Sequence, residues 1–262
     1  MTKKEDKMSL NNHEMAHEEL VSIIMPSYNS EKFILDSIHS VQQQTYENWE
    51  LLIVDDCSTD GTVALIENEV LNDSRIQLEV LSQNSGAAIA RNTAIKEAKG
   101  VYLAFLDSDD LWEKDKLTKQ INFMEMNQYL FTSTSFEEVD EENQLIDHIV
   151  KSHKQLDYEG VLKYCPGNST VIYNMKELGK FYIPDIKKRN DFVMWLQVIK
   201  KAEHLHGLEE VLSFYRVREG SLSKDKIDLV KYQWNVYRKI EGLPFFKSLY
   251  LLLHKTVSVL SK

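Results

Sequence analysis

Residues 101–112 read VYLAFLDSDDLW and join a short apolar segment to a cluster of three carboxylates. The six apolar residues before Asp107, aromatic and β-branched side chains among them, predict a buried parallel strand. In an open α/β sheet, ligands bind at the carboxyl end of such a strand. Asp107, Asp109 and Asp110 would repel one another there, and hard oxygen ligands favour Mg²⁺ or Mn²⁺. The alternative is an acidic turn in which Asp109 or Asp110 caps the following helix.

The composition is that of a globular protein. The 262 residues are 43% hydrophobic and 27% charged, enough for one large α/β domain or two small ones. A formal net charge of -10 argues against general nucleic-acid binding. Cys57 and Cys165 form neither a zinc spacing nor a disulfide framework, which suits a reducing cytoplasm. Residues 1–19 are polar and predict a disordered extension, and no apolar run is long enough to span a bilayer.

Strands and helices alternate four times in the first half of the chain. Apolar runs predict strands at residues 21–25, 49–54 and 76–81, before the strand that ends at Leu106. Helical spacing follows each of the first three, and Ser30 is the expected cap of the first helix. This order predicts a mostly parallel sheet with helices on both faces. Later elements are less regular; they include a helix beginning near Asn190 and a last strand at 211–217.

Polar loops follow all four predicted strands and would meet at one edge of the sheet. They contain Tyr28 with Asn29, Asp55 with Asp56, the segment 84–91, and the acidic cluster. An aromatic ring, hydrogen-bond acceptors, a glycine beside a helix N-terminus and a metal-binding carboxylate together predict a nucleotide-diphosphate site. Each loop also has a structural alternative, since aspartates form turns and Arg91 fits a surface helix charge.

The motifs resemble those of the family 2 glycosyltransferases, which have the GT-A fold. In chain order they are VSIIMPSYN (21–29), LIVDDCSTDGT (52–62), NSGAAIARNT (84–93), FLDSDDLW (105–112), RND (189–191) before Trp195, and YRVREGSLS (215–223). The resemblance implies an α/β, Rossmann-like, mostly parallel nucleotide-binding sheet and a mixed acceptor half in residues 20–223. A helical tail would occupy residues 224–262.

The resemblance also implies the residues of the donor site. Tyr28 would stack near the base, Asp56 would accept its N–H, and Asp107 would face the ribose. Asp109, with Asp107 beside it, would hold Mn²⁺ or Mg²⁺, and Arg91 would lie close to the nucleotide. The remaining donor-site positions are Ser27, Asn29, Asn84, Gly86, Ser108, Arg216 and Arg218.

Asp191 is the general base that the resemblance implies. The chemistry requires one, because an acceptor hydroxyl is a poor nucleophile until a carboxylate takes its proton. Direct displacement then inverts the anomeric centre. The structural alternative is an acid that interacts favourably with a helix N-terminus. Asn190 departs from the family, because many relatives carry glutamate at this position.

Arg218 is a second departure, since relatives often have histidine there. Arg216 and Arg218 alternate on a predicted strand and would face the same side. A guanidinium pairs with a diphosphate but does not ligate a metal as imidazole does. The loop 219–221 would close over the nucleotide as a lid, and the alternative is an exposed basic edge strand.

These features predict an inverting, metal-dependent transferase. The donor would be a nucleotide-sugar, expected to be UDP-linked, and a hexosyl or N-acetylhexosaminyl group would pass to a glycan or lipid-linked acceptor in cell-surface polysaccharide synthesis. The alternative is an inactive sugar-nucleotide-binding or scaffolding module. A sugar-nucleotide pyrophosphorylase and a nicotinamide dehydrogenase both require a glycine-rich loop after the first strand, and residues 25–29 contain no glycine.

The tail has an apolar helical stripe. From Lys224 onward it contains eight Lys or Arg and three Asp or Glu. The apolar residues that recur at helical spacing are Phe246, Leu249, Tyr250, Leu253, Val257 and Leu260. One interpretation is peripheral contact with the inner face of the membrane. The other is packing against the catalytic domain or a second subunit, and both can hold for different faces.

Overall fold

The computed structural model describes residues 19–184, 186, 189–218 and 226–260, with side chains for all of these except 226–229 and 256–260. Ten strands form one sheet in the order β3-β2-β1-β4-β9-β6-β10-β5, with β7 added on β6 and β8 on β10. The strands are β1 (Val21–Ser27), β2 (Trp49–Asp55), β3 (Ile76–Val80), β4 (Tyr102–Phe105), β5 (Leu111–Trp112), β6 (Phe131–Val139), β7 (Leu145–Val150), β8 (Gln155–Leu156), β9 (Ile172–Asn174) and β10 (Leu205–Arg216).

The first four strands are parallel, as predicted. β1 pairs with β2 and with β4, and β2 pairs with β3. The chain therefore moves outward from β1 to β3 and returns to place β4 on the other side of β1. This reversal is a topological switch point, where the loops after β1 and β4 lie next to each other and ligands typically bind.

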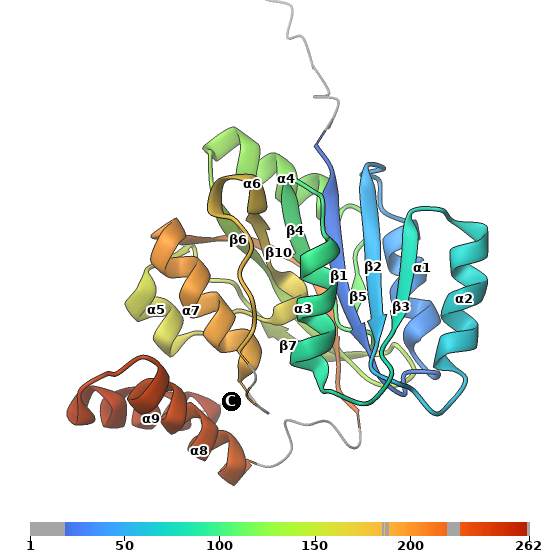
Figure 1. Ribbon diagram of the computed structural model, residues 1–262. Coiled ribbons are helices and arrows are strands. Elements are labelled where there is room, and N and C mark those ends of the chain that lie inside the picture. Colours follow the sequence, from blue (N-terminus) through green and yellow to red (C-terminus); the bar gives the residue numbers. More distant parts are fainter. Residues whose placement is uncertain (1–18, 185, 187–188, 219–225, 261–262) are drawn as a thin grey trace, which may run out of the picture.

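Helices cover both faces of the sheet (Figure 1). Apolar residues of α1 (Ile34–Gln42), α2 (Thr62–Asn72) and α4 (Lys116–Asn127) belong to one buried cluster. Those of α3 (Ala87–Glu97) and α7 (Asn190–Ala202) belong to a second cluster on the opposite face. The predicted apolar face of α7, which includes Phe192 and Trp195, is fully buried.

The predicted Ser30 cap is wrong, and so is the alternative in which the acidic loop caps a helix. α4 begins at Lys116 with Asp115 in the cap position, so neither Asp109 nor Asp110 caps a helix. α1 begins at Ile34, and no side chain caps it. The Ser30 hydroxyl instead lies 2.8 Å from the Ser108 hydroxyl, across the switch point.

The second half of the sheet is mixed. β9 runs antiparallel to both β4 and β6, whereas β10 is parallel to β6. β10 begins at Leu205, six positions before the predicted start, and the prediction did not identify the short edge strands β5, β7 and β8. Between β8 and β10 the chain also forms α5 (Tyr158–Lys163), the 3₁₀ turn η1 (Asn168–Thr170) and α6 (Met175–Leu178).

The tail forms α8 (Lys226–Asn235), the π-helix η2 (Val236–Ile240) and α9 (Phe245–Leu260), beside α5 and α7 (Figure 1). Its inner side joins the core through Tyr237 and Leu251, which are buried. The part of the predicted stripe whose side chains are described, Phe246 to Leu253, faces outward, and Phe246 is 82% exposed. Val257 and Leu260 lie outside the described side chains. Among the described residues, no helix combines the length and apolarity needed to cross a bilayer. The predicted N-terminal extension up to residue 18 and the predicted lid loop from 219 lie outside the described residues.

Candidate active site

The acidic loop after β4 lies at the switch point and is held from two sides. The Ser169 hydroxyl of η1 donates to Asp110 Oδ2 at 2.5 Å and accepts from the Asp107 backbone N–H at 3.1 Å. Asn168 Nδ2 donates to Asp107 Oδ1 at 2.9 Å. Neither Asn168 nor Ser169 was predicted, because a short polar turn gives no sequence signal that it contacts a loop 61 positions away.

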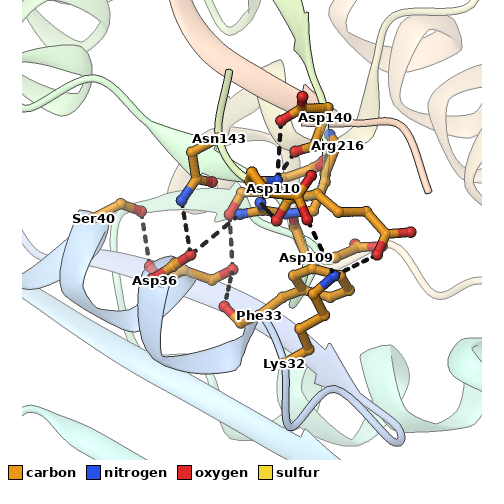
Figure 2. Close-up of polar contacts among 12 residues, drawn as sticks. Lys32, Phe33, Asp36, Ser40, Asp109, Asp110, Asp140, Asn143 and Arg216 are labelled. Atoms are coloured by element: carbon orange, nitrogen blue, oxygen red, sulfur yellow. Dashed lines mark hydrogen bonds and ion pairs between the residues drawn. The ribbon is translucent and has the colours of Figure 1, made fainter. Parts of the chain in front are cut away.

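Arg216 holds the loop from the β10 side (Figure 2). It is 1% exposed, and its Nε donates to the Asp109 carbonyl at 2.8 Å while its backbone N–H donates to Asp110 Oδ1 at 3.1 Å. Its Nη1 reaches the Asp140 carbonyl at 3.3 Å. The sequence predicts Arg216 as a donor-binding residue that faces the same side as Arg218. The structure places it underneath the acidic loop, where it fixes the loop backbone.

The three carboxylates differ in environment. Asp110 is buried, and burial together with the charges of Asp109 and Asp107 raises its pKa well above the ordinary value. Burial also raises the pKa of Asp109, with Arg218 opposing and Asp107 adding to that shift. Arg218 Nε lies 2.7 Å from Asp109 Oδ2. Asp109 and Asp107 are therefore the partly exposed carboxylates, and Asp110 belongs to the supporting structure.

Asp109 and Asp107 alone are too few ligands for a divalent cation, so substrate and water oxygens would have to complete its coordination. Among the described residues, no group of three or more His, Cys, Asp or Glu is placed to hold a metal ion. Mg²⁺ in proteins often has one or two carboxylates as ligands and takes the remainder from substrate phosphates and water. Asp109 and Asp107 match the protein part of that donor set.

Hydrogen bonds join the loops after β1, β2 and β3. Asp56 is buried, and its two carboxylate oxygens accept the backbone N–H groups of Ser85 and Gly86 at 2.6 and 2.7 Å. Gly86 has a φ of 93°, which a side chain would strain. Asn29 Oδ1 accepts the Thr59 backbone N–H at 2.9 Å. Asp56 can still accept from a base, because a carboxylate has about four lone-pair sites.

Open and unpaired groups lie along the same edge. The Tyr28 ring is 46% exposed, as a stacking surface requires. The Ser27 hydroxyl is buried and has no hydrogen-bond partner. Asn84 Nδ2 reaches the Asp56 carbonyl at 3.3 Å. The structure thus gathers the predicted donor residues of the four loops at one edge.

Arg91 connects this edge to Asp191. Its Nη2 lies 2.6 Å from Asp107 Oδ1, and its Nη1 lies 3.5 Å from Asn190 Oδ1. Burial works against its charge, but the carboxylates of Asp107, Asp191 and Asp109 hold the pKa of Arg91 above its ordinary value. Asp191 stands in the first turn of α7, and its backbone N–H donates to Asn190 Oδ1 at 2.7 Å. Asn190, the departure from the family, therefore links Arg91 to the start of the helix.

Comparison with known proteins gives a consistent picture. The family model "Glycosyl transferase family 2" matches residues 22–176. A Bacillus subtilis protein named as a teichuronic acid biosynthesis glycosyltransferase, TuaG, is 39% identical over 93% of this chain and 97% of its own length. The Escherichia coli "UDP-Glc:alpha-D-GlcNAc-diphosphoundecaprenol beta-1,3-glucosyltransferase WfgD" is 38% identical over 92% of this chain and 94% of its own.

Solved structures agree in fold. Staphylococcus aureus TarS, crystallised in complex with UDP-GlcNAc, has a TM-score of 0.70 at 22% identity, over 90% of this chain and 71% of that one. A mannosyltransferase from Pyrobaculum calidifontis, in complex with GDP-Man and Mn²⁺, has a TM-score of 0.65 at 18% identity, over 92% and 74%. The fold is the predicted GT-A fold.

Proposed function

Because this chain belongs to glycosyltransferase family 2, we propose that it is an inverting enzyme that moves a hexosyl or N-acetylhexosaminyl group from a UDP-sugar to a lipid-linked glycan acceptor in surface polysaccharide synthesis. The Arg91 bridge carries the proposal. One buried guanidinium contacts Asp107 on the donor side and Asn190 beside Asp191. Arg91 therefore links one of the proposed donor-site carboxylates to the residue that precedes the proposed base.

Asp191 would act on the acceptor. An acceptor hydroxyl attacks the anomeric carbon as the Asp191 carboxylate takes its proton, while the bond from that carbon to the diphosphate breaks. Attack from the side opposite the leaving group inverts the configuration.

Asp109 and Asp107 would hold Mn²⁺ or Mg²⁺ together with the diphosphate oxygens. When bound, the cation neutralises negative charge that develops on the departing diphosphate. Arg218 is the second positive group at this position, since it already contacts Asp109. The donor diphosphate would therefore be recognised by a basic side chain as well as by the metal.

Relatives support the choice of substrates. The name of WfgD specifies UDP-glucose as its donor and a diphosphoundecaprenol-linked sugar as its acceptor. TarS was crystallised with UDP and with UDP-GlcNAc. The uracil base of the donor would stack on the Tyr28 ring, and the Asp56 carboxylate would accept its N–H.

The outward face of α9 would rest on the membrane surface at the cytoplasmic side. Phe246, Tyr250 and Leu253 are more than half exposed there. An apolar helix face with nearby lysines binds anionic bilayers peripherally. Phe246→Ser combined with Leu253→Ser should abolish co-sedimentation with anionic vesicles at low salt while leaving UDP affinity unchanged. If the variant instead keeps vesicle binding and loses a dimer in sedimentation velocity, the face is a subunit contact.

A nucleotide-sugar screen tests the proposed reaction. The full chain is incubated with UDP-, GDP- and dTDP-sugars, with Mn²⁺ or with EDTA, and release of the nucleoside diphosphate is measured. We expect release from a UDP-sugar only with metal, and none from Asp109→Ala. If the chain binds the donor but releases no nucleoside diphosphate, whichever acceptor lipid is supplied, the chain is the inactive binding module instead.

A further inference from the structure

Lys116 begins α4 with its whole side chain inside the protein. It is 0% exposed, and its Nζ donates to Gln120 Oε1 at 2.9 Å, one turn later on the same helix. The Nζ also lies 4.0 Å from the centre of the Trp112 ring. Burial lowers the pKa of Lys116 well below its ordinary value, so the amine lies there at a cost. A fully buried lysine is rare in proteins, and the contacts of this one point to a specific use.

Gln120 uses both ends of its amide group. Its Nε2 donates to the Thr132 hydroxyl on β6 at 3.1 Å and to the Thr170 carbonyl of η1 at 3.0 Å. A side-chain amide can turn around so that its oxygen and its nitrogen exchange places. Lys116 selects one of the two orientations, because its Nζ donates to the amide oxygen. The amide nitrogen is thereby directed at η1.

Trp112 supports the same turn from β5. Its Nε1 donates to the Ser169 carbonyl at 2.7 Å, and the Ser213 hydroxyl of β10 donates to that carbonyl at 3.1 Å. Two successive carbonyls of η1 are therefore fixed, one by Trp112 and the next by Gln120. Lys116 contacts both of these side chains.

The side chains of η1 contact the acidic loop in turn. The Ser169 hydroxyl binds the Asp107 backbone N–H and the Asp110 carboxylate. Asn168 Nδ2 donates to the Asp107 carboxylate. A shift of η1 would consequently shift Asp107, one of the two carboxylates proposed for the metal. The contacts thus run without a break from the buried amine to the acidic loop.

We infer that Lys116 is a positioning residue, which fixes η1 through Gln120 and Trp112 and so holds the acidic loop in the geometry that binds the metal and the diphosphate. The inference rests on the proposed function for what the loop binds. The hydrogen bonds that position the loop form without any ligand, so the two can be tested separately. Lys116 acts through other side chains, and its removal should therefore weaken binding.

Hydrogen exchange of the ligand-free full chain tests the positioning. In Lys116→Met, which keeps an unbranched side chain, the segment 105–112 should exchange about fivefold faster than in wild type, the effect of one weakened hydrogen bond. This segment contains the Asp107 N–H that the Ser169 hydroxyl holds. Ile121→Val is the matched control for stability. It loses a buried methylene at the next position of α4, lowers the thermal midpoint and should leave this exchange unchanged.

Calorimetry then measures the affinity for UDP in the presence of Mn²⁺. Lys116→Met should bind about tenfold more weakly, the scale at which groups that orient metal ligands act. Lys119→Met, at a partly exposed lysine on the same helix, should bind as wild type does. If Lys116→Met does not fold, Gln120→Glu carries the test, because it keeps an acceptor for Lys116 and sets an oxygen against the Thr170 carbonyl. Gln120→Glu should show the same faster exchange and weaker binding.

Wild-type exchange of the segment 105–112 in Lys116→Met, or in Gln120→Glu where that variant carries the test, overturns the inference. Faster exchange with unchanged affinity also overturns it, because the position of the loop would then not matter for binding. Equal effects in Ile121→Val would show a loss of general stability and would overturn it as well. If exchange rises as expected but the wild-type chain binds no nucleoside diphosphate, the proposed function fails and the positioning of the loop by Lys116 stands.

Discussion

The Arg218 guanidinium is paired with the Asp109 carboxylate, with 2.7 Å between Nε and Oδ2. Asp109 is also the carboxylate expected to hold the divalent metal. A metal ion at Asp109 would compete with the Arg218 guanidinium for the same negative charge, because like charges repel each other at short distance. The donor diphosphate would offer Arg218 an alternative partner, which would couple metal binding to nucleotide binding.

Arg218→Gln should therefore strengthen Mn²⁺ binding in the absence of nucleotide. Loss of a partly exposed ion pair corresponds to about 1 kcal/mol, or roughly fivefold in affinity. The same variant should weaken UDP binding, because the diphosphate loses a basic partner. Electron paramagnetic resonance of free Mn²⁺ measures the first effect and calorimetry the second. Mn²⁺ affinity that stays the same or falls would show that Arg218 does not compete with the metal.

Asp56→Asn tests the hydrogen bonds that join the loops after β2 and β3. The carboxylate accepts two backbone N–H groups, and an amide oxygen cannot replace both of its oxygens. We expect the free energy of unfolding to fall by about 1–3 kcal/mol, the cost of a buried donor left unpaired, and UDP affinity to fall with it. Urea denaturation measures the first. Glu79→Gln, at an exposed carboxylate on β3, is the control and should leave both values unchanged.

Arg216→Lys should destabilise the acidic loop although the charge is kept. A lysine cannot reproduce the donors that Arg216 directs to the carbonyls of Asp109 and Asp140. The expected loss is about 1–3 kcal/mol in unfolding free energy. A direct diphosphate contact would predict weaker UDP binding at full stability, and that result would contradict the supporting role.

Lys255→Met tests whether the Lys255 ammonium is buried, through the pH dependence of protein stability. The folded pKa of about 8 lies below the ordinary 10.5, so between these values the unfolded chain binds more protons than the folded one. Wild-type stability should consequently rise with pH across this window and be flat below it. The Lys255→Met variant should lack this rise and be more stable than wild type at pH 7. Parallel pH profiles of the unfolding midpoint would contradict the shifted pKa.

The sequence was sufficient to predict the parallel half of the sheet and the edge at which the polar loops meet. Each buried strand there is a continuous apolar run that ends in a polar loop, so the pattern fixes both the element and its functional end. The contacts of Ser169 and Arg216 with the acidic loop could not be predicted, because they depend on how the mixed half packs against β4.

The tail shows the same limit. Helical spacing identified the apolar stripe, and its residues from Phe246 to Leu253 face outward. Spacing alone could not show that the opposite side would bring Lys255 to Phe192, since that depends on how α9 packs against α5 and α7.

Single-turnover transfer by Asp191→Asn, compared with wild type, tests the central claim most directly. The substitution keeps the shape of the side chain and removes its basicity. With the donor and a lipid-linked acceptor at saturation, turnover should fall by roughly 10²-fold or more, while UDP affinity measured on the same samples stays unchanged. Unchanged turnover accompanied by a loss of UDP affinity would contradict the account and make Asp191 a structural acid at the start of α7.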